Sequence, residues 1–190
     1  LKQYSSTRVS IAGVKTTIMR SDFGQVNAYN LLLAKQEAPR LREELLDKGK
    51  SLEIKPVSLE VLDILRVEKG IPAYGKELSE EFNPLEANLL NCISFTKGCY
   101  VGQEVVARLN TYQKVQKKLV GLRWNSKSRL TPNSKILIEG KQIGFVTSVA
   151  SSPRLDHGLG LGYVRSVHAE SGTVLSVSEG NEEILVEVLT

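Results

Sequence analysis

Apolar residues in the first half of the chain follow strand-like and helix-like spacing in turn. Three segments alternate as strands do, and they are residues 8–12, 27–34 and 51–57. A helix is predicted over 39–48, because Pro39 suits its first turn and Gly49 suits the position after its end. Strands that alternate with helices indicate a mixed α+β architecture for this half of the chain.

A second helix is predicted over 58–70, and one acidic residue conflicts with its pattern. The apolar face of this helix consists of Val61, Ile64 and Leu65. Glu68 falls seven residues after Val61 and so continues the apolar face. It also lies in the last turn, where the helix dipole disfavours a carboxylate. Such a conflict marks either a binding site or a carboxylate that a salt bridge satisfies, and the helical pattern leaves both open.

Two further helices are predicted before the chain changes character. Asn83 precedes Pro84 and Glu86 in the arrangement of a capping box, which indicates the start of a third helix. A fourth is predicted over 103–109, directly after a glycine-rich segment.

From about Lys118 the pattern becomes a series of short apolar runs separated by Gly, Asn, Ser and Pro. Six strands are predicted, over 119–124, 135–138, 143–150, 159–164, 173–177 and 184–189. A small closed barrel is the natural way for six strands to pair all their edges. The sequence therefore predicts two domains, residues 1–117 and residues 118–190.

Composition and charge bear on whether the protein binds a membrane or a nucleic acid. The 190 residues are 41% hydrophobic and 24% charged, and no apolar run reaches the roughly 18 residues of a membrane span, so no membrane partner is expected. The net charge of +4 comes from 25 basic and 21 acidic residues, which are mixed along most of the chain. A basic stretch contains Arg108, Lys114, Lys117 and Lys118. It carries neither aromatic spacing nor a helix-turn-helix pattern, so direct nucleic-acid binding is not expected.

Cys92 and Cys99 are the only cysteines, too few for a disulfide framework and wrongly spaced for a zinc site. No metal site is predicted, and a reducing compartment fits this usage best. Cys92 follows a predicted helix and is expected to be a small buried residue. His157 and His168 are assigned no role.

The segment from Lys97 to Glu104, KGCYVGQE, concentrates reactive groups on a bent loop before the 103–109 helix. The helix N-terminus and Lys97 would both lower the pKa of the Cys99 thiol. Cys99 is therefore either a reactive or metal-ligating thiolate or an inert residue in a structural turn.

This segment resembles the K-G-C-[FY]-x-G-Q-E signature of the YgfZ-type folate-binding proteins, whose mitochondrial relatives act late in iron–sulfur cluster assembly. Residues 66–70 with Tyr74-Gly75 and residues 84–87 resemble the R-x-E-x-G, Y-G and P-x-E-A elements that this group shares with glycine-cleavage T-proteins. The resemblance implies an α+β fold: part of a T-protein-like, ferredoxin-like folate-binding domain, then a small six-stranded β-barrel. Family members have a further N-terminal lobe, which supplies much of the folate pocket.

The resemblance also implies roles for individual residues. In that superfamily the glutamate of R-x-E-x-G hydrogen-bonds the folate pterin, which assigns this role to Glu68. The residues expected to contact the cofactor, tetrahydrofolate or a one-carbon derivative, are Glu68, Arg66, Tyr74, Tyr100 and Gln103. Cys99, supported by Lys97, is expected to carry cluster-related or thiol chemistry.

The function implied is a folate-binding accessory protein that supports the assembly or repair of iron–sulfur proteins, with an effect on tRNA modification. Its partners would be folate and iron–sulfur assembly or client proteins. The alternatives are an aminomethyltransferase of the T-protein type and a binding module in RNA modification. T-proteins commonly have a basic residue where this chain has Gln103, and they lack the cysteine signature. The expected location is the bacterial cytoplasm, or an organellar matrix or stroma in a eukaryote.

Overall fold

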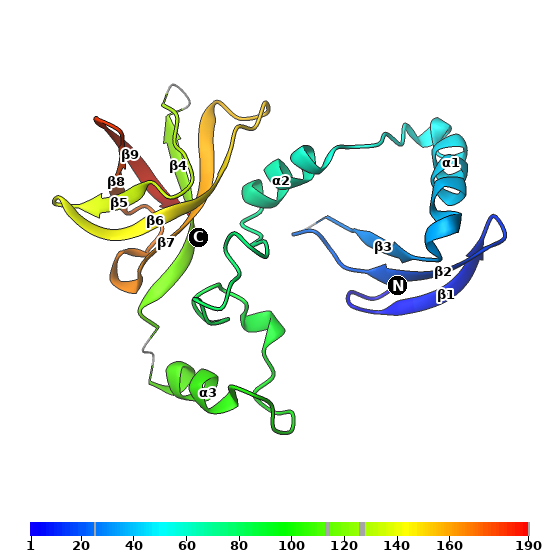
Figure 1. Cartoon of the computed structure of the whole chain (residues 1–190), viewed down its shortest axis with the longest axis horizontal. Helices are drawn as coiled ribbons and strands as arrows, with labels where there is room; N and C mark the ends of the chain where they lie inside the picture. Colours follow the sequence, from blue (N-terminus) through cyan, green and yellow to red (C-terminus); the bar gives the residue numbers. More distant parts are fainter. Residues whose placement is uncertain (25, 113–114, 126–127, 190) are drawn as a thin grey trace. The chain divides into compact units, whose positions relative to one another are not determined.

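The computed structural model describes residues 1–24, 26–112, 115–125 and 128–189 (Figure 1). The chain forms two compact units, residues 1–62 and 63–190. All the predicted barrel strands lie in the second unit, which also contains residues 63–116 before the first of these strands. Lys114 of the predicted basic stretch lies outside the described residues.

The first unit is a three-stranded antiparallel sheet with one helix. Its strands, in the order β1-β2-β3, are β1 (Ser6–Ile11), β2 (Val14–Arg20) and β3 (Tyr29–Leu32). A 3-10 turn, η1 (Lys35–Glu37), leads into α1 (Ala38–Lys48), which buries Leu41. Strand β2 was missed by the sequence patterns because its alternation is broken: Thr16 on the buried face is polar, and Met19 on the exposed face is apolar. The predicted helix over 39–48 is confirmed as α1.

The predicted strand over 51–57 is wrong. The chain forms a 3-10 turn, η2 (Lys50–Leu52), and Glu53 adopts a left-handed backbone with φ of 55°. The carbonyl of Gly49 accepts hydrogen bonds from the N–H groups of both Leu52 and Ile54. These bonds coil the backbone where a strand would extend it.

Helix α2 (Leu59–Glu68) confirms the second predicted helix. The capping box at Asn83 also forms, because its Oδ1 accepts the N–H of Glu86 while Glu86 Oε2 accepts the N–H of Asn83. No long helix follows in this part of the described chain, because Asn88 turns to φ of 56° and only a 3-10 turn, η3 (Leu90–Cys92), comes after it. Helix α3 (Gln103–Thr111) then forms as predicted. Of the helices in the described ranges, none combines the length and the apolar character that crossing a membrane requires.

The six predicted barrel strands are confirmed. They close in the order β4-β7-β6-β5-β8-β9, and every pair is antiparallel. The strands are β4 (Lys117–Asn125), β5 (Lys135–Ile138), β6 (Lys141–Ala150), β7 (His157–Arg165), β8 (Val174–Glu179) and β9 (Glu182–Leu189), with a 3-10 turn, η4 (Ser166–His168), after β7.

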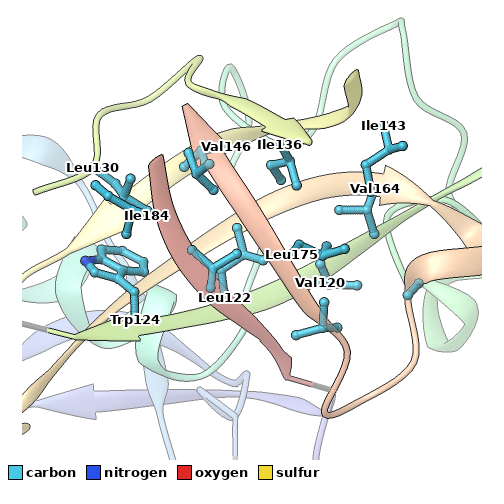
Figure 2. Close-up of a cluster of buried hydrophobic side chains, with 14 residues drawn as sticks. Val120, Leu122, Trp124, Leu130, Ile136, Ile143, Val146, Val164, Leu175 and Ile184 are labelled. Carbon is cyan, nitrogen blue, oxygen red and sulfur yellow. The ribbon is translucent and has the colours of Figure 1, made fainter. Parts of the chain in front are cut away.

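Side chains from all these strands meet inside the barrel, as Figure 2 shows for Leu122, Trp124 and Val146 among others. Strand β7 contributes glycines to this interior. A Cβ at Gly158 would lie 2.2 Å from the Trp124 ring, and one at Gly162 would lie 3.0 Å from Leu122. The large residues of β4 therefore fill space that small residues of β7 leave open.

The alternate residues of β7 point outward, and they are buried as well. Leu159, Leu161 and Tyr163 form a second apolar cluster with Leu119 and with Val67 of α2. Strand β7 is thus covered on both faces, inside by the barrel core and outside by the segment that precedes the barrel. This outer cluster holds the C-terminal end of α2 against the barrel.

The close approach of β6 to β7 allows a test of this packing. A Cβ at Gly144 would lie 2.0 Å from the Tyr163 carbonyl oxygen, a separation that forces the two strands apart. We expect Gly144→Ala to lower the free energy of unfolding by about 1–3 kcal/mol, measured by urea denaturation. Gly98→Ala is the control, since a Cβ there meets no atom within 4 Å. Equal stability of the two variants would contradict this account of β6–β7 packing.

Candidate functional site

A buried carboxylate, Glu77, lies where the segment before the barrel meets β6 and β7. Its side chain is fully buried, so it needs polar partners. Its Oε2 accepts hydrogen bonds from the Arg66 guanidinium at 2.8 Å and from the Ala73 N–H at 2.9 Å. Its backbone carbonyl accepts the Tyr163 hydroxyl at 2.9 Å. Glu77 is therefore bound by α2, by its own loop and by the barrel.

Arg66 is the cation that balances this carboxylate. Its guanidinium is buried and makes four hydrogen bonds, to Asp63, the Ile71 carbonyl, Glu77 and Ser148. Hydrogen bonds from Lys76 and then from Arg66 hold the pKa of the Asp63 carboxyl below its usual value. Four of the guanidinium's five N–H donors thus bind protein groups.

A bulge in β6 supplies the remaining partners of Glu77. The register of β6 against β7 shifts between Val146 and Ser148, so Thr147 is an extra residue in the strand. The hydroxyls of Thr147 and Ser148 both donate to Glu77 Oε1, at 2.7 and 2.6 Å. Two successive residues of a regular strand would point to opposite faces, and the bulge is what lets both reach one oxygen.

Aromatic rings enclose one side of this network. Phe82 stacks on Tyr163 with ring centroids 3.8 Å apart, and Lys117 Nζ lies 5.7 Å from the Phe82 centroid. Burial, and then the negative charges of Glu86 and Glu77, raise the pKa of the Tyr163 phenol. Its hydroxyl therefore stays protonated and continues to donate to the Glu77 carbonyl.

Glu68 is the last residue of α2, two positions after Arg66, and its side chain is half-buried. Within the described part of the chain its carboxylate has no hydrogen-bond or ion-pair partner. Gly70 follows with φ of 65°, and the Ile71 N–H returns to the Arg66 carbonyl at 2.8 Å. The end of the helix is fixed while the Glu68 carboxylate remains able to accept hydrogen bonds. A carboxylate in this state can accept a pair of adjacent N–H donors from a ligand.

Tyr74 lies at the tip of a tight loop and is 91% exposed. The carbonyl of Ala73 accepts the N–H groups of Lys76, Glu77 and Leu78. Gly75 has φ of 77°, a conformation that side chains disfavour. The loop is well hydrogen-bonded, so it presents the Tyr74 ring to solvent from a defined backbone.

The KGCYVGQE segment forms an exposed loop before α3. Lys97 Nζ lies 4.7 Å from the Tyr100 ring centroid, and Cys99 between them is free and exposed. Gly102 has φ of 84° and precedes Gln103, the first residue of α3. Cys92 is also exposed, so the prediction that it is buried is wrong, because the helix expected before it is only a turn.

The predicted site residues fall into two groups. Arg66, Glu68 and Tyr74 belong to the α2–loop segment, and Lys97, Cys99, Tyr100 and Gln103 belong to the loop before α3. No hydrogen bond, ion pair or ring contact joins these groups among the described residues. Sequence patterns missed Glu77 altogether. The one available signal was the polar pair Thr147-Ser148 within the apolar run 143–150 of β6, because one residue of such a pair falls on the apolar face of a regular strand.

Comparison with known proteins finds a matching family model for each of two segments of the chain. Residues 1–97 match the family model of the GCVT N-terminal domain, and residues 117–190 match that of the glycine cleavage T-protein C-terminal barrel domain. The chain shares the fold of the glycine cleavage system aminomethyltransferase T of Bartonella henselae, with a TM-score of 0.80 over 92% of the chain and 48% of that protein, at 24% identity. The predicted α+β T-protein-like domain followed by a six-stranded barrel is confirmed.

Relatives named aminomethyltransferase match along nearly all of the chain. The protein of Saccharopolyspora erythraea is 34% identical over 191 residues, which cover 100% of this chain and 52% of that protein. The protein of Natranaerobius thermophilus is 33% identical over 170 residues, 89% of this chain and 46% of that protein. The chain thus spans about half the length of the curated relatives it matches. With both family models matched in order, the chain belongs to the glycine cleavage T-protein family.

Proposed function

We propose that the protein binds tetrahydrofolate or a one-carbon derivative and that Glu68 accepts hydrogen bonds from its pterin. The observation that carries this proposal is a half-buried carboxylate at the fixed end of α2, within the R-x-E-x-G element, that has no hydrogen-bond or ion-pair partner among the described residues. Tyr74 lies beyond the same helix end with its ring exposed, available for stacking. When bound, the folate would supply the carrier for a one-carbon unit.

The activity that the comparisons favour is folate-dependent one-carbon transfer of the aminomethyltransferase type. Relatives with that name match from one end of the chain to the other. In this proposal the chain's own residues bind and orient the folate.

A second function is favoured by one specific segment. The exposed, free Cys99 in KGCYVGQE fits the YgfZ-type accessory role in iron–sulfur protein assembly or repair. Within the described ranges no three His, Cys, Asp or Glu side chains converge as a metal site would need. In this role the Cys99 thiolate would ligate or exchange together with groups of an iron–sulfur partner protein.

The folate proposal predicts a charge-specific loss of affinity. Replacing Glu68 by Gln in the complete protein removes the charged acceptor but keeps the shape, and we expect it to weaken tetrahydrofolate binding by about 1–3 kcal/mol. Isothermal titration calorimetry measures the change. Glu60→Gln is the matched control, since Glu60 is an exposed acid in the first turn of the same helix. Unchanged affinity in a folded Glu68→Gln protein would remove Glu68 from the pterin site.

Removing the Cys99 thiol distinguishes the aminomethyltransferase activity from the iron–sulfur accessory role. If the protein is an aminomethyltransferase, Cys99→Ser should leave one-carbon transfer intact, because the Cys99 loop makes no described contact with the α2 site. If it is an iron–sulfur accessory protein, Cys99→Ser should abolish rescue of iron–sulfur enzyme activity in cells that lack the protein. Cys92→Ser, also an exposed cysteine, is the control and should retain rescue. Full rescue by Cys99→Ser would exclude the thiol from the accessory role.

A further inference from the structure

We infer that Arg66 and Glu77 are positioning residues that hold Glu68 and Tyr74 in place for folate, and that Arg66 does not itself contact the ligand. This inference rests on the proposed folate function. It assigns a role to Glu77, Thr147 and Ser148, and it changes the role of Arg66 from a contact to a support.

Four of the five N–H donors of Arg66 are already occupied. Its Nε binds Asp63 at 2.7 Å, and its Nη1 binds both Glu77 and the Ile71 carbonyl. Its Nη2 binds Ser148, and the whole side chain is only 7% exposed. Because the guanidinium is buried and each of its three nitrogens bonds a protein group, we do not expect it to bind the folate as well.

The ion pair ties together the two segments that carry the proposed folate residues. Arg66 lies two residues before Glu68, and Glu77 lies three residues after Tyr74. Glu77 also accepts the Ala73 N–H, which is adjacent to Tyr74. This buried contact therefore links the backbones that carry Glu68 and Tyr74. Both residues themselves remain available, one half-buried and the other 91% exposed.

The barrel fixes the position of this pair. Ser148 accepts from Arg66 and donates to Glu77 Oε1, so it bridges the two charges. Thr147 donates to the same oxygen because of the β6 bulge. Tyr163 donates to the Glu77 carbonyl from β7. Groups that lie in the barrel would thus control the geometry of the folate site.

The test measures tetrahydrofolate affinity in the complete protein by calorimetry, at a temperature at which circular dichroism shows each variant folded. Ser148→Ala removes the hydroxyl that bridges the two charges, and we expect its Kd to rise roughly fivefold. Arg66→Met combined with Glu77→Gln removes both charges together, which avoids leaving one of them buried alone. For this double variant we expect a rise on the order of 10- to 100-fold, since small displacements of positioned groups have effects of that size.

Matched controls separate positioning from stability. Ser176→Ala deletes a buried barrel hydroxyl that bonds a main-chain carbonyl, and Val186→Ala loosens the barrel core. Arg123→Met with Glu187→Gln removes an exposed ion pair between β4 and β9. All three should bind folate with the Kd of the unmodified protein, even where the melting temperature falls.

Three results would overturn the inference. The first is an unchanged tetrahydrofolate Kd in a folded Ser148→Ala protein. This result is sufficient by itself if the double variant does not fold. Loss of affinity in Val186→Ala equal to that in Ser148→Ala is the second, since it would make the effect one of general stability. Failure of the unmodified protein to bind tetrahydrofolate is the third. It would remove the proposed function as well, whereas the first two leave that function standing.

Discussion

The structure of the second unit depends on one buried ion pair, between Arg66 of α2 and Glu77 of the following loop. Two ions taken out of water must recover their hydration from protein groups, and here each guanidinium nitrogen of Arg66 and each carboxylate oxygen of Glu77 has a protein partner. Glu77 receives bonds from Arg66, Ala73, Thr147 and Ser148, which together serve both its oxygens. Removing one partner of such a pair typically destabilises a protein by about 3–5 kcal/mol, because the other charge is left buried. The pair therefore specifies a single arrangement of α2 on the barrel.

The barrel is shaped to receive this pair. Glycines on the inner side of β7 make room for Trp124 and Leu122, so the strand can carry large residues on its outer side. Those outer residues pack against Val67, the neighbour of Arg66. Apolar contact and ion pair act on adjacent residues of the same helix end. The first brings α2 to the barrel without directional preference, and the second sets its position.

The periodicity of apolar residues predicted the strands and helices that local sequence determines. It did not predict features that depend on contacts between residues far apart in the chain. The six barrel strands and the helices at 39–48, 58–70 and 103–109 follow from alternation and helical spacing. The capping box at Asn83 was predicted correctly, but the left-handed backbone of Asn88 ends the segment, and only a turn forms after it. Glu77 gave no local sign, because its partners Thr147 and Ser148 lie 70 and 71 residues away. Its burial becomes intelligible only once β6 and its bulge are in place.

The R-x-E-x-G element combines two different uses of charge within three residues. Arg66 faces the barrel and hydrogen-bonds protein groups there, whereas Glu68 lies two positions on, past the buried face of α2, and accepts no hydrogen bond from the described residues. A rotation of about 100° per residue separates such positions by more than half a turn of helix. The same backbone segment can thus be anchored on one side and exposed to a ligand on the other. Glu68 therefore lies away from the buried face that Arg66 anchors, in the last turn where the helix dipole disfavours a carboxylate, and among the described residues no side chain pairs with it.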